Sequence, residues 1–165
     1  MRRAGWRGQR GSAWAWRPEA DGAVNIDGVP ATPLLDPETQ RLVAGERRYA
    51  AIATINEDGS VHQTVIWYLL RVEGIVINSR AGRRWPTNLL RDPRLSFTVM
   101  VGSDYVTLSG EAEPVDEGEM AHADIAEMAR RYTDPATAAR YIAQFRTQRR
   151  VSFVFHPRAA HTGSE

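Results

Sequence analysis

Short apolar segments separated by tight turn signals run through the middle of the chain, and this pattern constrains the fold more than any other feature. Five such segments predict strands: residues 49–56, 61–71, 75–79, 95–101 and 105–112. The first two are joined through Asp58-Gly59, which is a strong hairpin signal, and Gly74 and Gly102 lie in the next tight turns. Strands joined by tight turns pair antiparallel, so the pattern argues against a doubly wound parallel sheet.

A sixth strand is predicted at residues 151–156, where Val151, Phe153 and Phe155 point to one face. Six antiparallel strands joined in this way curl into a closed or split barrel. We therefore predict a mainly β (α+β) fold, a six-stranded antiparallel split β-barrel with short helices. The segment 61–71 is apolar on both faces, so we expect it at the centre of the sheet or packed against a second subunit.

Helices are predicted at three places outside the strands. Asp36 followed by Pro37 is typical of a helix start, and this helix is expected to end near Gly45. A basic loop from Arg80 leads into a short helix that Asp92-Pro93 terminates. After the fifth strand, Asp116 and Glu119 have capping-box spacing, and Asp134-Pro135 begins a second helix.

The chain length of 165 residues fits one globular domain, which we place at residues 34–158. Residues 1–33 are rich in Arg, Trp and Gly and predict a flexible extension, and 159–165 a C-terminal tail. The tryptophans of the extension, interleaved with Arg, would suit stacking on nucleic-acid bases. A net charge of +1 makes nucleic-acid binding by the whole domain unlikely, and an unstructured extension or an arm packed on a partner is the favoured interpretation.

The amino-acid composition excludes several classes of chemistry. The chain has no Cys, which excludes disulfides and thiolate chemistry, and all 21 basic residues are Arg, which excludes a Schiff-base Lys. The four His lack metal-ligand spacing, so no metal site is predicted, and Ser79 and Ser109 lack the context of a hydrolase nucleophile. No apolar run approaches the roughly 18 residues of a membrane span, and no secretory signal is found, so a cytoplasmic protein is expected.

The segment from Asn78 to Arg91 carries the clearest sign of function. Four arginines lie just before or within the predicted helix: Arg80, Arg83, Arg84 and Arg91. Helix N-termini attract anions, and Arg forms bidentate contacts with phosphate oxygens. Two interpretations stay open from the residues alone, a phosphate-binding site and a solvated basic loop paired with acidic neighbours.

From residue 35 to 157 the sequence resembles the pyridoxamine-phosphate-oxidase-like flavin and deazaflavin oxidoreductases. The resemblance lies in an ordered set of segments, namely 49–54 with Asp58-Gly59, His62 to Tyr68, Asn78-Ser79, Gly82-Arg83-Arg84 with Asn88-Leu89, 91–94, and 105–112 ending in Gly-x-Ala. It implies a split β-barrel homodimer with two cofactors at the subunit interface.

The resemblance also implies which residues bind the cofactor. The ring would lie against Thr64, Val65, Ile66 and Trp67, and the phosphate would be held by Ser79, Arg83, Arg84 and Asn88, with Asn78 and Trp85 in the same segment. Many family members carry a Lys at the position of Trp85. Here either Arg83 or Arg84 takes over the anion, or Trp85 stacks on the cofactor, or the pocket is altered.

Three functions follow as expectations. The first is a reductase that uses the deazaflavin coenzyme F420 to reduce a small organic substrate, and the second is an FMN-binding oxidase or reductase. The third is a non-catalytic binder of a flavin, a tetrapyrrole or a lipid. No catalytic side chain is predicted, because hydride transfer is the chemistry of the cofactor, and the proton donor would be solvent, Tyr68 or an Arg-bound water.

Overall fold

The computed structural model describes residues 35–164, so the predicted extension 1–33 lies outside the described part. Its elements follow one another as α1 (Pro37–Ala44), β1 (Ala50–Ile55), β2 (Val61–Ile66), β3 (Tyr68–Arg71), β4 (Gly74–Arg80), α2 (Arg84–Arg91), β5 (Arg94–Val101), β6 (Asp104–Asp116), α3 (Glu119–Tyr132), α4 (Pro135–Arg146) and β7 (Arg150–Ser164). The fold is thus mainly antiparallel sheet with four short helices, and the predicted α+β class is confirmed.

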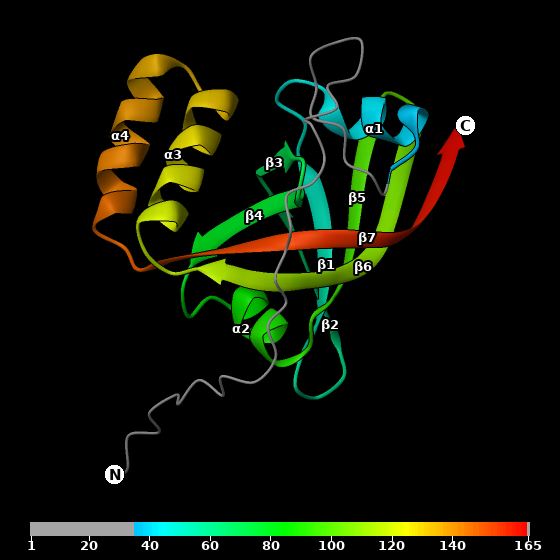
Figure 1. Cartoon of the computed structure of the whole chain (residues 1–165), viewed down its shortest axis with the longest axis horizontal. Helices are drawn as coiled ribbons and strands as arrows, with labels where there is room; N and C mark the ends of the chain where they lie inside the picture. Colours follow the sequence, from blue (N-terminus) through cyan, green and yellow to red (C-terminus); the bar gives the residue numbers. More distant parts are fainter. Residues whose placement is uncertain (1–34, 165) are drawn as a thin grey trace.

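A single sheet forms the barrel, with the strand order β2-β1-β5-β6-β7-β4-β3 and every neighbouring pair antiparallel. The two outermost strands, β2 and β3, are consecutive in the chain and are separated only by Trp67. The sheet therefore curls until its two edge strands meet at Trp67. There they are joined through the backbone of this residue and do not pair by hydrogen bonds. This geometry is the split barrel that the turn pattern predicts (Figure 1).

The structure has seven strands where six were predicted, because the apolar segment 61–71 is divided at Trp67. The backbone N–H of Tyr68 donates to the hydroxyl of Tyr132 in α3 (3.3 Å), and the Trp67 ring stacks on the Tyr132 ring with centroids 5.3 Å apart. Helix α3 thus supplies the acceptor for a backbone N–H group that a neighbouring strand would otherwise satisfy. The expectation of a central strand is wrong, since β2 and β3 are the two edges of the sheet.

Alternating side chains of the strands fill the barrel, as the period of two requires. The fully buried members are large and apolar, among them Ile52, Phe97, Leu108, Phe153 and Phe155. Helices α1 and α2 lie at opposite ends of the barrel, and α3 and α4 form a hairpin beside β3 and β4 (Figure 1). A second, smaller cluster joins α3 to the outer face of β4 through Val76, Ile125 and Met128.

The helix starts agree with the sequence except at α3. Asp36 caps α1 and Asp134 caps α4, each followed by Pro as predicted. Helix α3 begins at Glu119 with Gly118 at its N-cap, so the predicted capping box of Asp116 and Glu119 is not formed. The Asp116 carboxylate instead accepts from the backbone N–H groups of Gly118 and Ala121, both at 2.8 Å.

The last strand is longer than the sequence pattern predicts. β7 continues to Ser164 and pairs with β6 throughout, so residues 159–164 of the predicted tail are part of the sheet. The two strands approach closely at Gly110, where an added Cβ would lie 2.1 Å from the carbonyl oxygen of His156. Within residues 35–164, no helix has the length and apolar character that crossing a membrane requires.

Candidate functional site

A groove of about 600 Å³ lies where β2, the end of β4 and the start of α2 face the α3–α4 hairpin. Its lining residues are Tyr49, His62, Thr64, Val65, Ile66, Trp67, Asn78, Ser79, Arg83, Arg84, Trp85, Ile125, Tyr141, Phe145 and Arg150. Arg83, Arg84 and Arg150 form its basic end, and this end adjoins an aromatic wall that includes Phe145, the ring under the Arg150 guanidinium. The position of the groove follows from the split in the barrel, because β2 and β3 diverge at Trp67 and leave the sheet edge open.

Nine of the ten residues predicted to bind a cofactor line this groove: Thr64, Val65, Ile66, Trp67, Asn78, Ser79, Arg83, Arg84 and Trp85. Asn88 does not line it. The Asn88 amide is buried and donates to the side-chain oxygens of Thr54 (3.0 Å) and Asn56 (2.9 Å), which joins α2 to β1. The structure thus places Asn88 as a support of the helix whose N-terminus faces the groove.

The N-terminus of α2 is uncapped at the basic end of the groove. Arg83 is the N-cap residue in an extended conformation, no side chain bonds to the first turn, and the first turn has no acidic residue. The first N–H groups of a helix have no partner within the helix, and together with the macrodipole they favour an anion. The residue types at this terminus therefore leave it positive.

Ser79 presents an unsatisfied polar atom in the same region. Its side chain is 2% exposed, and its Oγ has no hydrogen-bond partner among the described residues. A buried hydroxyl without a partner costs free energy unless a ligand or water satisfies it. Ser79 is the last but one residue of β4, directly before the basic loop, so a ligand that contacts α2 is within its reach.

Arg150 is the residue that sequence reasoning missed. It opens β7, is 4% exposed, and donates from Nε (3.0 Å) and Nη2 (2.7 Å) to Oδ1 of Asn78 and from Nη1 to Oε1 of Gln148 (2.9 Å). Its guanidinium lies over the Phe145 ring, 4.7 Å from the centroid. No described carboxylate lies within 4 Å of it. Burial, helped by the charges of Arg83 and Arg80, lowers the pKa of Arg150 to about 10.

An unneutralised buried cation of this kind is unfavourable alone, because desolvation and neighbouring positive charges both disfavour the charged form. A bound anion would offset both effects. The pairing register places Arg150 directly opposite Arg80, at the same end of the sheet as Arg83. That neighbourhood is created by strand pairing between distant parts of the chain, and the pair Arg149-Arg150 before an apolar strand is the only local sign of it.

Trp85 is part of the core rather than of an exposed stacking surface. It is 5% exposed, and its ring packs at 50° on Phe153 with centroids 5.8 Å apart. The Trp85 ring is buried in the barrel and is not free to stack on a ligand. Of the alternatives for this position, this favours arginine side chains as the cations that would contact an anion.

An aromatic wall formed by Trp67, Tyr141 and Phe145 adjoins the basic end, because Phe145 lies under the Arg150 guanidinium. Trp67 lies 5.8 Å from Tyr141, and Tyr141 stacks on Phe145 at 5.6 Å and 13°. Tyr141 and Phe145 belong to α4. A flat wall of this kind suits a planar ring system.

Besides Asn88, three candidates from the sequence do not line the groove, namely Arg80, Tyr68 and Arg91. The Tyr68 hydroxyl donates to the carbonyl of Val43 (2.6 Å) inside the barrel, and burial raises its pKa, so Tyr68 is not placed to donate a proton to a ligand. Arg91 donates to the carbonyl of Ile55 and is not part of the basic end.

A split barrel with a basic and aromatic groove is an architecture of cofactor-binding proteins, and sequence comparison places the chain in a family with this architecture. The sequence profile described as pyridoxamine 5'-phosphate oxidase matches residues 35–162, so the chain belongs to this family. Family members typically bind flavin-type cofactors. No curated protein sequence matches the chain.

Solved structures share the fold. A conserved hypothetical protein from Mycobacterium tuberculosis is 27% identical, with a TM-score of 0.65 over 82% of this chain and 89% of that one. A protein named F420 reductase is 20% identical (TM-score 0.61, 77% of this chain and 98% of that chain). HutZ, the heme storage protein from Vibrio cholerae, is 19% identical (TM-score 0.60, 79% and 94%).

Proposed function

We propose that this chain is an oxidoreductase that binds the deazaflavin coenzyme F420 in the groove and reduces a small organic substrate. The observation that carries the proposal is the unneutralised basic end of the groove, where Arg83, Arg84 and Arg150 surround an uncapped helix terminus. The structural likeness to an F420 reductase supports the choice of cofactor. The all-Arg composition is consistent with a GC-rich genome. That coenzyme is common in bacteria with such genomes.

The residues of the groove fit such a cofactor at both ends. The phosphate would accept from Ser79 Oγ, from the first turn of α2 and from the arginines, and so satisfy a hydroxyl that has no described partner. The ring system would lie between β2 and the aromatic wall.

When bound, a deazaflavin or flavin supplies hydride transfer, and the protein supplies position and electrostatics. The residues of this chain then bind the anion, orient the ring and keep water from the aromatic end. His62 and Tyr141 carry exchangeable protons in the groove wall, and both line the aromatic half with Trp67. A proton for the substrate would come from one of these groups or from solvent.

FMN is the alternative cofactor, because it shares the phosphate and the planar ring with F420. A non-catalytic tetrapyrrole binder is a further candidate, favoured by the structural likeness to the heme storage protein HutZ. The three candidates differ in the ligand that binds most tightly, so one binding experiment separates them.

We further propose a cytoplasmic homodimer in which the outer face of β2, β1 and β5 is the subunit interface. The strand register puts uncharged side chains on this face: Ala51, Ala53, Val61, Val65, Thr98 and Met100. Val61, Val65 and Met100 are 68%, 63% and 69% exposed, which is unusual for apolar side chains gathered on one sheet face. Val65 also lines the groove, so a second copy would close it. The lack of Cys is compatible with a reducing compartment.

The proposal is tested by titrating the purified protein with F420, FMN and heme while following ligand fluorescence or absorbance. We expect F420 to bind with a Kd in the micromolar range or below and more tightly than FMN. Riboflavin, which lacks the phosphate, should bind more weakly than FMN. Tightest binding of heme would instead support the storage function, and binding of none of the three would refute a cofactor role for the groove.

Substitution of the exposed arginines checks the site itself. Arg83→Ala or Arg84→Ala should weaken F420 binding about tenfold, equivalent to about 1.4 kcal/mol, because each removes a cation from the phosphate end. Arg140→Ala, on the far part of α4 and bonded only to Thr137, is the control and should leave the Kd unchanged. Unchanged affinity in both single variants and in the double variant would refute the placement of the phosphate.

A further inference from the structure

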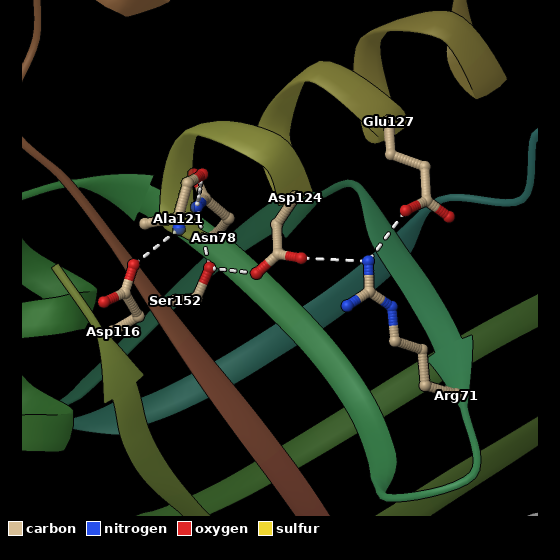
Figure 2. Close-up of polar contacts among 7 residues, drawn as sticks. All are labelled: Arg71, Asn78, Asp116, Ala121, Asp124, Glu127 and Ser152. Carbon is tan, nitrogen blue, oxygen red and sulfur yellow. Dashed lines mark hydrogen bonds and ion pairs between the residues drawn. The ribbon is translucent and has the colours of Figure 1, made fainter. Parts of the chain in front are cut away.

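A continuous chain of hydrogen bonds runs from Arg150 into helix α3. The Arg150 guanidinium donates to Asn78 Oδ1, Asn78 Nδ2 donates to Ser152 Oγ (2.9 Å), and Ser152 Oγ donates to Asp124 Oδ2 (2.6 Å). Figure 2 shows the part from Asn78 through Ser152 to Asp124, with Asp124 facing Arg71. Asn78, Ser152 and Asp124 are all buried, at 7%, 0% and 3% exposure.

The direction of every bond in this chain is determined by chemistry. A guanidinium can only donate, so Asn78 must present its oxygen to Arg150. The carbonyl of Ala121 can only accept, so the Asn78 nitrogen must face it, and it does so at 2.8 Å. Ser152 accepts from Asn78 and therefore directs its own proton to the carboxylate. All polar groups of Asn78 are thus used within the protein, and none is directed to a ligand.

The far end of the chain is fixed by an ion pair. Asp124 Oδ1 lies 2.9 Å from Nη2 of Arg71, and Glu127 contacts the same nitrogen at 2.7 Å. The charge of Asp124 is therefore balanced by Arg71 and does not reach Arg150 directly. Two neutral groups, Asn78 and Ser152, separate the carboxylate from the Arg150 guanidinium. The buried carboxylate holds Arg150 in place without neutralising it.

The Arg150 guanidinium keeps unused donors in this arrangement. Of its five N–H groups, three donate to Asn78 and Gln148, which leaves one on Nη1 and one on Nη2. This pair is the fork that binds an oxyanion through two parallel hydrogen bonds. An Asp at position 78 would accept the same two bonds from Arg150, but its negative charge would neutralise the guanidinium.

We propose that Arg150 is an anion-binding residue of the groove and that Asn78 is its positioning residue, with Ser152 and Asp124 holding Asn78 in turn. The ligand class is a phosphate group or another oxyanion of similar size. The inference rests on the proposed function for the identity of the groove, but not on the identity of the cofactor. It assigns Asn78 a role that acts through Arg150 rather than by touching the ligand.

The test uses inorganic phosphate as the probe and nuclear magnetic resonance of the Arg150 Nε–H group as the signal. In the wild-type protein, phosphate should move this resonance in a saturable way. Asn78→Ala should weaken phosphate binding about tenfold, near the lower limit for a hydrogen bond to a charged group, and shift the Arg150 resonance before phosphate is added. Asn88→Ala, which removes an amide of equal burial away from Arg150, is the matched control and should leave that resonance unchanged.

The same substitution in an Arg150→Met background separates positioning from general damage to the fold. If Asn78 acts through Arg150, Asn78→Ala adds no further loss of phosphate affinity there. Equal losses in both backgrounds would overturn the inference. Where Asn78→Ala does not fold, Ser152→Ala removes only the second link and is measured in the same cycle, with the same expectation.

The outcomes distinguish this inference from the proposed function. Phosphate binding that leaves the Arg150 resonance in place would overturn the inference while the anion site at Arg83 and Arg84 stands. A wild-type protein that does not bind phosphate would overturn both.

Discussion

At the scale of single residues, the position of Trp85 bears on how this chain would hold an anion without a Lys, as the proposed function requires. Trp85 follows the two arginines that start α2, but its ring points into the barrel and packs on Phe153. The positive charge at this helix start is supplied by Arg83 and Arg84, with Arg150 added from β7. In the proposed site these arginines would take the place of a Lys at position 85, whereas the Trp85 ring packs in the core.

Trp85→Lys should consequently destabilise the protein without tightening anion binding. Replacing a core Trp by a smaller side chain costs about 3 kcal/mol or more, and burying an amine adds to this cost. Chemical denaturation measures the loss, with Trp85→Phe as the milder control. A Trp85→Lys protein of wild-type stability with tighter F420 binding would show instead that the Lys position of the family is retained in the groove.

The residues of the site differ in how far the sequence could reveal them. Ser79, Arg83 and Arg84 are contiguous with a strand-to-helix transition, so local charge and helix electrostatics were enough to mark them. Arg150 and Tyr141 come to the groove by strand pairing and by packing of the α3–α4 hairpin. No local pattern encodes those contacts. The role of Asn78 depends on bond directions that only coordinates can show.

At the scale of elements, short-range chemistry sets the helix starts and long-range packing sets the strand ends. Asp36 and Asp134 accept from the backbone of their helices, as their place before Pro predicts. The division of 61–71 at Trp67 depends on Tyr132, which is far away in the sequence, and the extension of β7 to Ser164 depends on the length of β6. Local patterns therefore gave the order of the elements but not these boundaries.

The cap of α1 gives a pH dependence with a definite sign. Hydrogen bonds from the Thr39 side chain and backbone lower the pKa of Asp36 below its ordinary value of 3.8. Because the carboxylate is favoured in the folded state, its contribution is present above that value and is lost as the pH falls through the lower folded-state pKa.

Asp36→Ala should therefore cost about 1 kcal/mol of unfolding free energy near pH 7. The difference from wild type should shrink as the pH falls below 3.8, measured by urea unfolding across that range. Asp36→Asn keeps an acceptor oxygen and should lose less. A difference that grows on acidification would contradict the assigned role of the carboxylate.

At the scale of the whole molecule, the groove opens at the edge of the barrel next to the exposed face of β2, β1 and β5. Val65 belongs to both, so one protomer presents an open groove beside an apolar surface. The α3–α4 hairpin lines the groove on its other side with Tyr141 and Phe145. A second copy on the open side would complete the enclosure.

Two matched methionines test this arrangement. Met100 lies on the outer face of β5 and Met120 on α3, and they are 69% and 58% exposed. Met100→Glu should shift the protein toward monomer, because it places a charge in the proposed interface, whereas Met120→Glu should not. Sedimentation velocity reads the oligomeric state of both. A wild-type monomer, or a dimer that tolerates Met100→Glu, would place the interface elsewhere.

The most direct test of the central claim is a crystal structure of the protein with the cofactor that binds most tightly. The account predicts the phosphate at the N-terminus of α2, within hydrogen-bond distance, about 3 Å, of Ser79 Oγ and the arginine side chains, and the ring beside Trp67. A phosphate found away from α2, or a ring bound outside the groove, would contradict it.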